Sequence, residues 1–249
     1  MLGTLDRLGE NVTSETEALG SVAEILDLLG EIEASDAKAG VSIELTQFGL
    51  DLGPALVVEN VQCVMDRAAQ AGIFIRIDME SSEYVQPTLD LFERLWQYRK
   101  SVSVVVQSYL YRSADDVARL VELGAPVRLV KGAYDEPADA AYPEMAATDA
   151  NFVRLADQES GVYPAIATHD GELIEWVREH THRVGLARDR IEFQILYGIR
   201  RGLRHSLASE GYRVRVCIPY GAHWYPYFMR RLGERPANLL FVLSDLLRA

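Results

Sequence analysis

Cysteine and long apolar segments are both scarce in this sequence. Its 249 residues include two cysteines, Cys63 and Cys217, which form neither a disulfide framework nor a metal-binding motif. We therefore expect a protein of the reducing cytosol. No apolar run reaches the roughly 18 residues that a membrane-spanning helix needs. The first residues lack the apolar stretch of a signal peptide, and we interpret the apolar segment 239–247 as a helix that closes the domain.

Positive charge is in short supply as well. Lysine and arginine number 25 against 37 acidic residues, which gives a formal net charge of -12. This balance argues against nucleic acid as a partner and against a general attraction to anionic lipid. A hydrophobic content of 49% with 25% charged residues is that of an ordinary globular protein. The length suits one domain, because (β/α) barrels of about 250 residues are common.

Most motifs of self-contained catalysis are absent. The sequence has no Walker loop, no glycine fingerprint of a dinucleotide-binding βαβ unit and no G-x-S-x-G elbow. Its five histidines lack zinc spacing, and Cys217 with His223 nearby is weak support for a nucleophilic dyad. These absences favour an enzyme whose chemistry is carried by a bound cofactor.

Short β-branched runs alternate with longer helical segments along the whole chain. Ser14-Glu15-Thr16-Glu17 has the pattern of a capping box, Pro54 is expected to open a helix, and Ser113 to cap another. This alternation predicts a single-domain, distorted (β/α)₈ TIM barrel over residues 1–249. A doubly wound open sheet is the alternative, since its local pattern is the same. The expected strands are 4–8, 41–45, 73–77, 102–106, 127–130, 165–167, 191–195 and 214–218.

Polar residues collect where these strands end. A (β/α)₈ barrel places its active site at the carboxyl ends of its strands. Any one of these residues is readily explained as a helix cap or a structural histidine. A ring that combines acids, amides, cations and an imidazole is harder to explain by capping. The ring consists of Glu10, Glu44, Thr46, Asp78, Gln107, Arg128, Lys131, Thr168, His169, Gln194 and Cys217.

The segment 217–234 carries a candidate anion clamp. After a β-type run that ends at Pro219, a helical pattern places Tyr227, Arg230, Arg231 and Glu234 on one face. Two adjacent guanidiniums suit a small carboxylate, because each presents a planar fork of donors. The alternative is a solvated face with an Arg230–Glu234 pair, worth about 0.3–0.5 kcal/mol.

Several spaced segments resemble signatures of the proline dehydrogenase family. They are 128–134 (RLVKGAY), 193–198 (FQILYG) and 227–234 (YFMRRLGE), supported by 6–10, 77–78, 106–107 and 167–169. The resemblance spans residues 6–238 and implies a distorted (β/α)₈ barrel that binds FAD. It further implies oxidation of L-proline to Δ1-pyrroline-5-carboxylate, with electrons passed to a membrane quinone. A separate pyrroline-5-carboxylate dehydrogenase is then a possible partner. The expected location is the cytoplasm, with peripheral contact at the inner membrane as an option.

The resemblance also implies roles for individual residues. Arg230 and Arg231 would bind the substrate carboxylate, with Glu10 pairing with one of them and Asp78 orienting both. Arg128 would lie near flavin N5, where a fixed cation stabilises the charge that arrives with hydride. The substrate ring would contact Tyr227, Leu196 and Tyr134. The flavin edge would contact Gln107 and the backbone at Met79, and the ribityl and diphosphate would contact Lys131, Gly132, Ala133, Thr168 and His169.

Two positions depart from the family pattern. Glu44 stands where lysine is usual near the substrate carboxylate, so it should weaken carboxylate binding unless it pairs with a cation. Cys217 stands where tyrosine is usual over the substrate ring, and the smaller side chain favours 4-hydroxyproline or another cyclic imino acid as an alternative substrate. Two further hypotheses are a degenerate flavin-binding barrel without catalysis and a phosphate-binding barrel enzyme. The sequence also lacks helices before its first strand, as a fragment or a minimal form would.

Overall fold

The computed structural model describes residues 1–159 and 163–221. The chain divides into two compact units. What we call the first unit contains Leu2–Val105 and Ile218–Gly221. The second unit contains Val106–Cys217, together with Met1.

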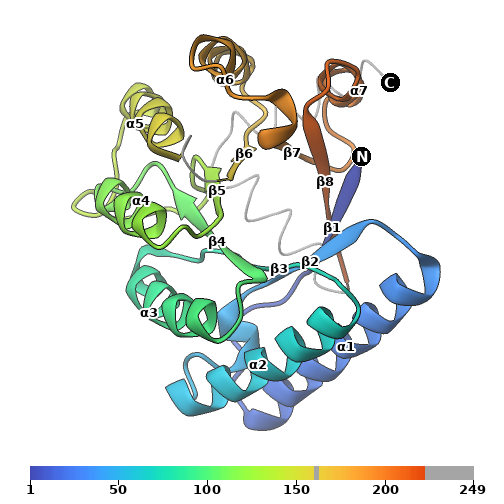
Figure 1. Ribbon diagram of the computed structural model, residues 1–249. Helices are drawn as coiled ribbons and strands as arrows, with labels where there is room; N and C mark the ends of the chain where they lie inside the picture. Colours follow the sequence, from blue (N-terminus) through green and yellow to red (C-terminus); the bar gives the residue numbers. More distant parts are fainter. Residues whose placement is uncertain (160–162, 222–249) are drawn as a thin grey trace. The chain divides into compact units, whose positions relative to one another are not determined.

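Eight parallel strands follow one another in sequence order in a closed barrel, which confirms the predicted fold class (Figure 1). Their registers are regular: Ser42 of one strand lies opposite Arg76 of the next, and Gln194 lies opposite Arg215. The strands are β1 (Leu2–Arg7), β2 (Ala39–Ile43), β3 (Ile75–Ile77), β4 (Val102–Gln107), β5 (Val127–Val130), β6 (Pro164–Ala167), β7 (Glu192–Leu196) and β8 (Arg213–Tyr220).

The helices of the first unit begin close to the predicted signals. They are α1 (Glu15–Ser35), the 3₁₀ turn η1 (Leu45–Phe48), α2 (Pro54–Gln70) and α3 (Ser82–Tyr98), and α1 lies beside α2 (Figure 1). Ser14 caps α1, because its hydroxyl accepts a hydrogen bond from the Glu17 amide at 3.3 Å. The Glu17 carboxylate accepts from the Thr13 amide at 2.7 Å. Hydrogen bonds from the backbones of Thr13 and Ser14 lower the pKa of Glu17, so the Ser14 backbone takes part as the expected capping box requires.

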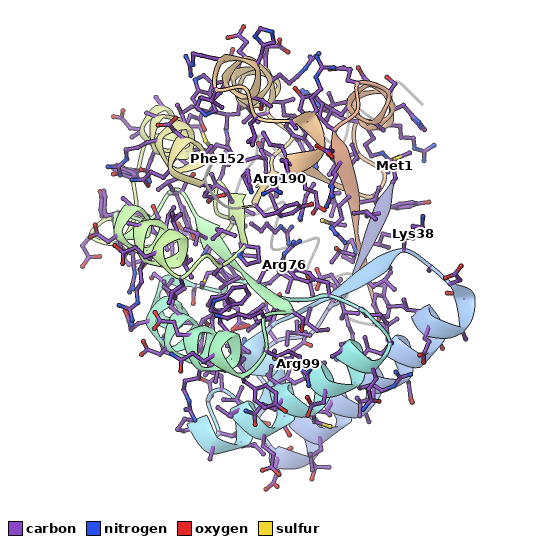
Figure 2. The ribbon with its side chains drawn as sticks, in the orientation of Figure 1. Met1, Lys38, Arg76, Arg99, Phe152 and Arg190 are labelled. Atoms are coloured by element: carbon purple, nitrogen blue, oxygen red, sulfur yellow. The ribbon has the colours of Figure 1, made fainter. Side chains whose placement is uncertain are left out.

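The helices of the second unit are α4 (Ser113–Glu122), α5 (Met145–Gln158), α6 (Gly171–Arg183) and α7 (Arg201–Ser209), with a 3₁₀ turn η3 (Arg188–Arg190). The prediction that Ser113 caps a helix was wrong. The N-cap is Arg112, and the Ser113 hydroxyl donates to the Leu110 carbonyl at 2.7 Å. Phe152 of α5 is fully buried and anchors that helix in the core (Figure 2).

Each unit also buries charged groups among its strands. In the first unit the side chain of Arg76 of β3, labelled in Figure 2, is buried. Its Nε donates to the Ser103 hydroxyl at 3.1 Å. In the second unit Arg215 forms a 2.7 Å ion pair with the fully buried Glu192. Gln194 donates to the same Glu192 carboxylate at 2.6 Å, so it belongs to the interior of β7 and not to the strand end where we expected it. Such pairing is what allows a charge to be buried at all.

Candidate active site

Four of the predicted site residues come together in the second unit. Leu196 and Cys217 are register partners on β7 and β8, so their side chains leave the same face of the sheet. Arg128 of β5 directs Nη2 to the Cys217 sulfur at 3.7 Å. His169 Nε2 accepts a hydrogen bond from the Leu196 amide at 3.0 Å, which places its proton on Nδ1 when the ring is neutral. A guanidinium, an imidazole and a small buried thiol therefore surround the end of β7.

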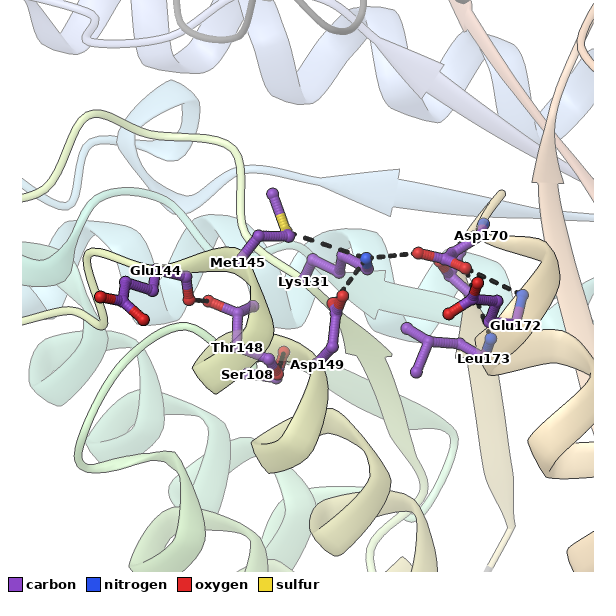
Figure 3. Close-up of polar contacts among 10 residues, drawn as sticks. Ser108, Lys131, Glu144, Met145, Thr148, Asp149, Asp170, Glu172 and Leu173 are labelled. Carbon is purple, nitrogen blue, oxygen red and sulfur yellow. Dashed lines mark hydrogen bonds and ion pairs between the residues drawn. The ribbon is translucent and has the colours of Figure 1, made fainter.

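The Lys131 ammonium lies at the start of α6, held by two carboxylates. Its Nζ atom is 2.6 Å from Oδ1 of Asp149 and 2.7 Å from Oδ2 of Asp170 (Figure 3). Asp170 is the N-cap of α6, and its own amide donates to the Thr168 hydroxyl at 3.1 Å. Burial favours the neutral carboxyl of Asp170, but the hydrogen bond and charge of Lys131 outweigh it and lower the pKa. No sequence pattern points to Asp149, whereas Asp170 has the pattern of a helix cap.

Gly132 brings the loop after β5 close to the residues that follow β4. It has a φ of 122°, and a Cβ atom there would overlap the ring of Tyr109. The Tyr109 amide donates to the Lys131 carbonyl at 2.9 Å, which fixes the two loops together. Gln107, the last residue of β4, is buried. Only glycine fits at position 132, and Ala133 and Tyr134 follow it, both partly buried.

The first unit gathers acidic groups around Glu44. This side chain is only 8% exposed, and its Oε2 accepts from the Gln47 side-chain amide at 3.1 Å. Burial raises the pKa of Glu44 well above its ordinary value. Nearby carboxyls add to this effect by repulsion, so the neutral acid is favoured. These carboxyls belong to Asp6, Glu10, Glu80 and Asp78.

Asp78 and Met79 follow β3 as expected. The Asp78 amide donates to the Ile43 carbonyl at 2.9 Å, and its Oδ1 accepts from the Ser42 hydroxyl at 3.3 Å. Met79 is buried. Sequence reasoning missed Glu80, whose carboxylate accepts from the Thr46 hydroxyl at 2.5 Å. Burial raises the pKa of Glu80 to about 7. The only feature of the sequence that could have suggested Glu80 as a site residue is its position, two residues after Asp78.

The proposed carboxylate clamp lies outside the described residues. Tyr227, Arg230 and Arg231 belong to that part of the chain, so the pairing with Glu10 and the orienting role of Asp78 stay predictions. Within residues 1–159 and 163–221, no group of three or more His, Cys, Asp or Glu side chains is arranged to hold a metal ion. Among the helices of the same residues, none has both the length and the apolar character to cross a membrane.

Comparison with known proteins agrees with the resemblance in the motifs. A family model described as "Proline dehydrogenase" matches residues 1–243. "Proline dehydrogenase" of Deinococcus radiodurans is 42% identical over 253 residues, covering 99% of this chain and 82% of that protein. "Proline dehydrogenase 2" of Bacillus subtilis strain 168 is 40% identical over 245 residues, covering 98% and 81%.

A solved structure shows the same fold. Proline utilization A (PutA) from Bdellovibrio bacteriovorus, inactivated by N-propargylglycine, superposes with a TM-score of 0.85 at 26% identity. The match covers 93% of this chain but spans only 30% of that larger protein. Since a family model and relatives above 30% identity match nearly the whole sequence, the chain belongs to the proline dehydrogenase family.

Proposed function

We propose that this protein oxidises L-proline to Δ1-pyrroline-5-carboxylate with FAD as its resident cofactor. Family membership supports the reaction class. The observation that carries the proposal for this chain is the convergence of Arg128, His169 and Cys217 at the end of β7, beside Leu196. A guanidinium and an imidazole lie beside Leu196 and Cys217 there, which suits a site for a planar ring system and a small cyclic substrate.

The residues of the second unit fit a flavin dinucleotide. A flavin needs polar partners at its pyrimidine edge and cations or helix N-termini at its phosphates. Gln107 offers a buried amide for the first need. Lys131, which pairs with Asp149 and Asp170 at the start of α6, offers an ammonium for the second. Thr168 and His169 come just before α6 in the chain.

In the proposed reaction FAD, when bound, supplies the acceptor for the hydride that leaves the carbon next to the proline nitrogen. Arg128 stabilises the negative charge that arrives with the hydride. Arg230 and Arg231 hold the substrate carboxylate. A hydride leaves only when the nitrogen lone pair is free, so the amine must be bound neutral. A cationic pocket favours that state because it lowers the pKa of the bound ammonium. We expect the rate to rise with pH as bound substrate deprotonates.

The electron acceptor in this proposal is a membrane quinone, as the resemblance implies. The protein would then meet the membrane peripherally and pass its product to a pyrroline-5-carboxylate dehydrogenase. A soluble quinone analogue should support turnover in the absence of any second acceptor. Failure of every quinone tested, with a different acceptor supporting turnover, would refute this part.

An anaerobic absorbance measurement tests the central proposal. The purified protein should be yellow, and L-proline should bleach its flavin band while D-proline does not. Arg128→Met should bind flavin and bleach far more slowly. A protein that binds no flavin, or a flavin that L-proline leaves oxidised, would contradict the proposal. The second of these outcomes would instead support the non-catalytic flavin-binding barrel.

A second candidate substrate is 4-hydroxyproline, and Cys217 is the observation that favours it. The side chain is buried, and its sulfur lies 3.7 Å from both Arg128 Nη2 and Gln194 Oε1, so a polar group is well accommodated beside it. The test compares the wild type with Cys217→Tyr on both substrates. Tyrosine should shift kcat/KM toward proline. An unchanged preference would show that this position does not select the ring.

A further inference from the structure

The loop that joins β1 to α1 carries Glu10. Both residues that flank Glu10 in the chain are hydrogen-bonded to the η1 turn, which follows β2. The Gly9 carbonyl accepts from the side-chain amide of Gln47. On the other side, the Asn11 amide donates to the Thr46 hydroxyl at 3.1 Å. One short turn therefore holds the backbone on both sides of Glu10.

Further contacts strengthen this attachment. Gln47 Nε2 also donates to the Arg7 carbonyl at 2.9 Å, and the Val12 amide donates to the Thr46 carbonyl at 3.4 Å. A Cβ atom at Gly9 would lie 3.4 Å from Gln47 Nε2, so a larger side chain there would crowd the amide. Thr46 and Gln47 are 0% and 1% exposed, so water competes little for their hydrogen bonds.

Two buried carboxyls orient the donors and acceptors of the turn. The Thr46 hydroxyl donates to Glu80 Oε1 at 2.5 Å, so its oxygen presents a lone pair to the Asn11 amide. Glu44 Oε2 accepts from Gln47 Nε2 at 3.1 Å. This contact keeps the nitrogen of the Gln47 amide, and not its oxygen, turned toward the carbonyls of the loop.

The carboxyl of Glu10 lies near these two buried acids. Burial raises the pKa of Glu44 and of Glu80, and the charge of Glu10 adds to the effect in both cases. Since like charges repel, a loose loop would let Glu10 move away from them. The attachment to η1 keeps this acid in place, as pairing with a cation requires.

We propose that Thr46 and Gln47 are positioning residues, which hold Glu10 where it pairs with a substrate-binding arginine and thereby set the affinity for the substrate. This inference rests on the proposed function, in which Arg230 and Arg231 hold the substrate carboxylate. Neither Thr46 nor Gln47 touches the substrate in this assignment. Both act through Glu10, so their loss should change KM and leave kcat nearly unchanged.

Thr46→Val tests the attachment, because valine has the shape of threonine without its hydroxyl. In hydrogen exchange followed by NMR, the Asn11 amide should exchange roughly three- to tenfold faster, as expected for the loss of one hydrogen bond. Thr46→Ser keeps the hydroxyl and should restore the exchange rate of the wild type. Thr88→Val is the matched control, since Thr88 is also buried in the first unit, on α3. It should leave the exchange of the Asn11 amide unchanged.

A double-mutant cycle with Glu10→Gln tests the role in substrate binding. Thr46→Val should raise the KM for L-proline roughly three- to tenfold, with kcat within twofold. When residue 10 is already glutamine, Thr46→Val should raise KM no further. Gln47→Met releases Gly9 instead and leaves the bond between Thr46 and Glu80 intact. It should give the same pattern of KM and kcat, which decides the matter where Thr46→Val does not fold.

Two results in a protein that oxidises L-proline would overturn the inference and leave the proposed function intact. One is an Asn11 amide that exchanges in Thr46→Val as it does in the wild type. The other is a pair of KM effects, from Thr46→Val and Glu10→Gln, that add in the double variant. A wild type that does not oxidise L-proline would remove both the inference and the proposed function.

Discussion

Glu80 makes the stability of this protein depend on pH in a calculable way. Its side chain is 4% exposed, and its Oε1 accepts a 2.5 Å hydrogen bond from the Thr46 hydroxyl. Burial raises the pKa of Glu80 from 4.5 to about 7, even though the bond from Thr46 works in the opposite direction. The folded protein therefore holds a proton on Glu80 in a range where the unfolded chain has released it.

The sign follows from this difference in bound protons. Between pH 4.5 and pH 7 the folded state binds more protons than the unfolded state, so the free energy of unfolding falls as the pH rises. A pKa difference of about 2.5, at about 1.36 kcal/mol for each pKa unit, corresponds to about 3 kcal/mol. This contribution of Glu80 is fully present below its unfolded pKa and is lost above pH 7.

Glu80→Gln removes the titration while keeping the size and shape of the side chain. The amide oxygen still accepts from Thr46, so any fixed cost of the amide is the same at every pH. The free energy of unfolding of the wild type should fall relative to that of the variant as the pH rises. The difference, variant minus wild type, should be about 2–3 kcal/mol larger at pH 8.5 than at pH 5. In thermal unfolding the difference in Tm between the variant and the wild type should widen by roughly 4–12 °C over the same range.

Glu83→Gln is the matched control, because Glu83 is an exposed acid on α3 a few residues further along. Its stability profile should run parallel to that of the wild type. If the free energy of unfolding of Glu80→Gln also ran parallel to that of the wild type across this pH range, the reasoning would be refuted. A buried carboxyl with a raised pKa must make the difference between the two proteins change with pH. A gap that narrows with rising pH would show that Glu80 is stabilised as the anion.

Three further predictions concern two glycines and a helix cap. Gly132→Ala should lower stability and cost flavin binding, because a Cβ at φ 122° overlaps the ring of Tyr109; an equally stable, flavin-loaded variant would contradict this. Gly20→Ala on the exposed side of α1, where nothing lies within 4 Å of the new Cβ, should raise the free energy of unfolding by about 0.5–1 kcal/mol in urea titration. Ser14→Ala should lower the free energy of unfolding by about 1 kcal/mol, because it removes the cap of α1.

The strands were readily predicted because each is a short apolar or β-branched run, and two of them, β3 and β4, are buried along their whole length. The expected strand 127–130 coincides with β5, and the remaining predicted strands overlap the observed ones to within a few residues at each end. A parallel barrel requires near-continuous apolar runs, and turn residues such as Gly124, with φ 65°, separate them cleanly. Strand order then follows from sequence order, since each crossover places the next strand beside the last.

The polar contacts were harder to predict because they depend on residues far apart in the chain. Lys131 was expected at a cofactor, and nothing in its local sequence indicates Asp149 as a partner. Ser113 has a capping pattern, yet its hydroxyl bonds a carbonyl in the preceding turn and the helix starts one residue earlier than a cap allows. Local patterns predict the element, while the tertiary fold decides which donor meets which acceptor.

Glu44 shows how the fold changes the meaning of a substitution. In the sequence it reads as an anion where the family usually has a cation, which predicts repulsion of a substrate carboxylate. In the structure Glu44 is buried, accepts a bond from Gln47, and has a pKa raised well above its ordinary value by burial and by neighbouring carboxyls. A neutral acid does not repel a carboxylate. Compared with the usual lysine, Glu44 therefore removes one cation that would attract the substrate carboxylate. The repulsion predicted from the sequence should appear only at a pH high enough to ionise Glu44.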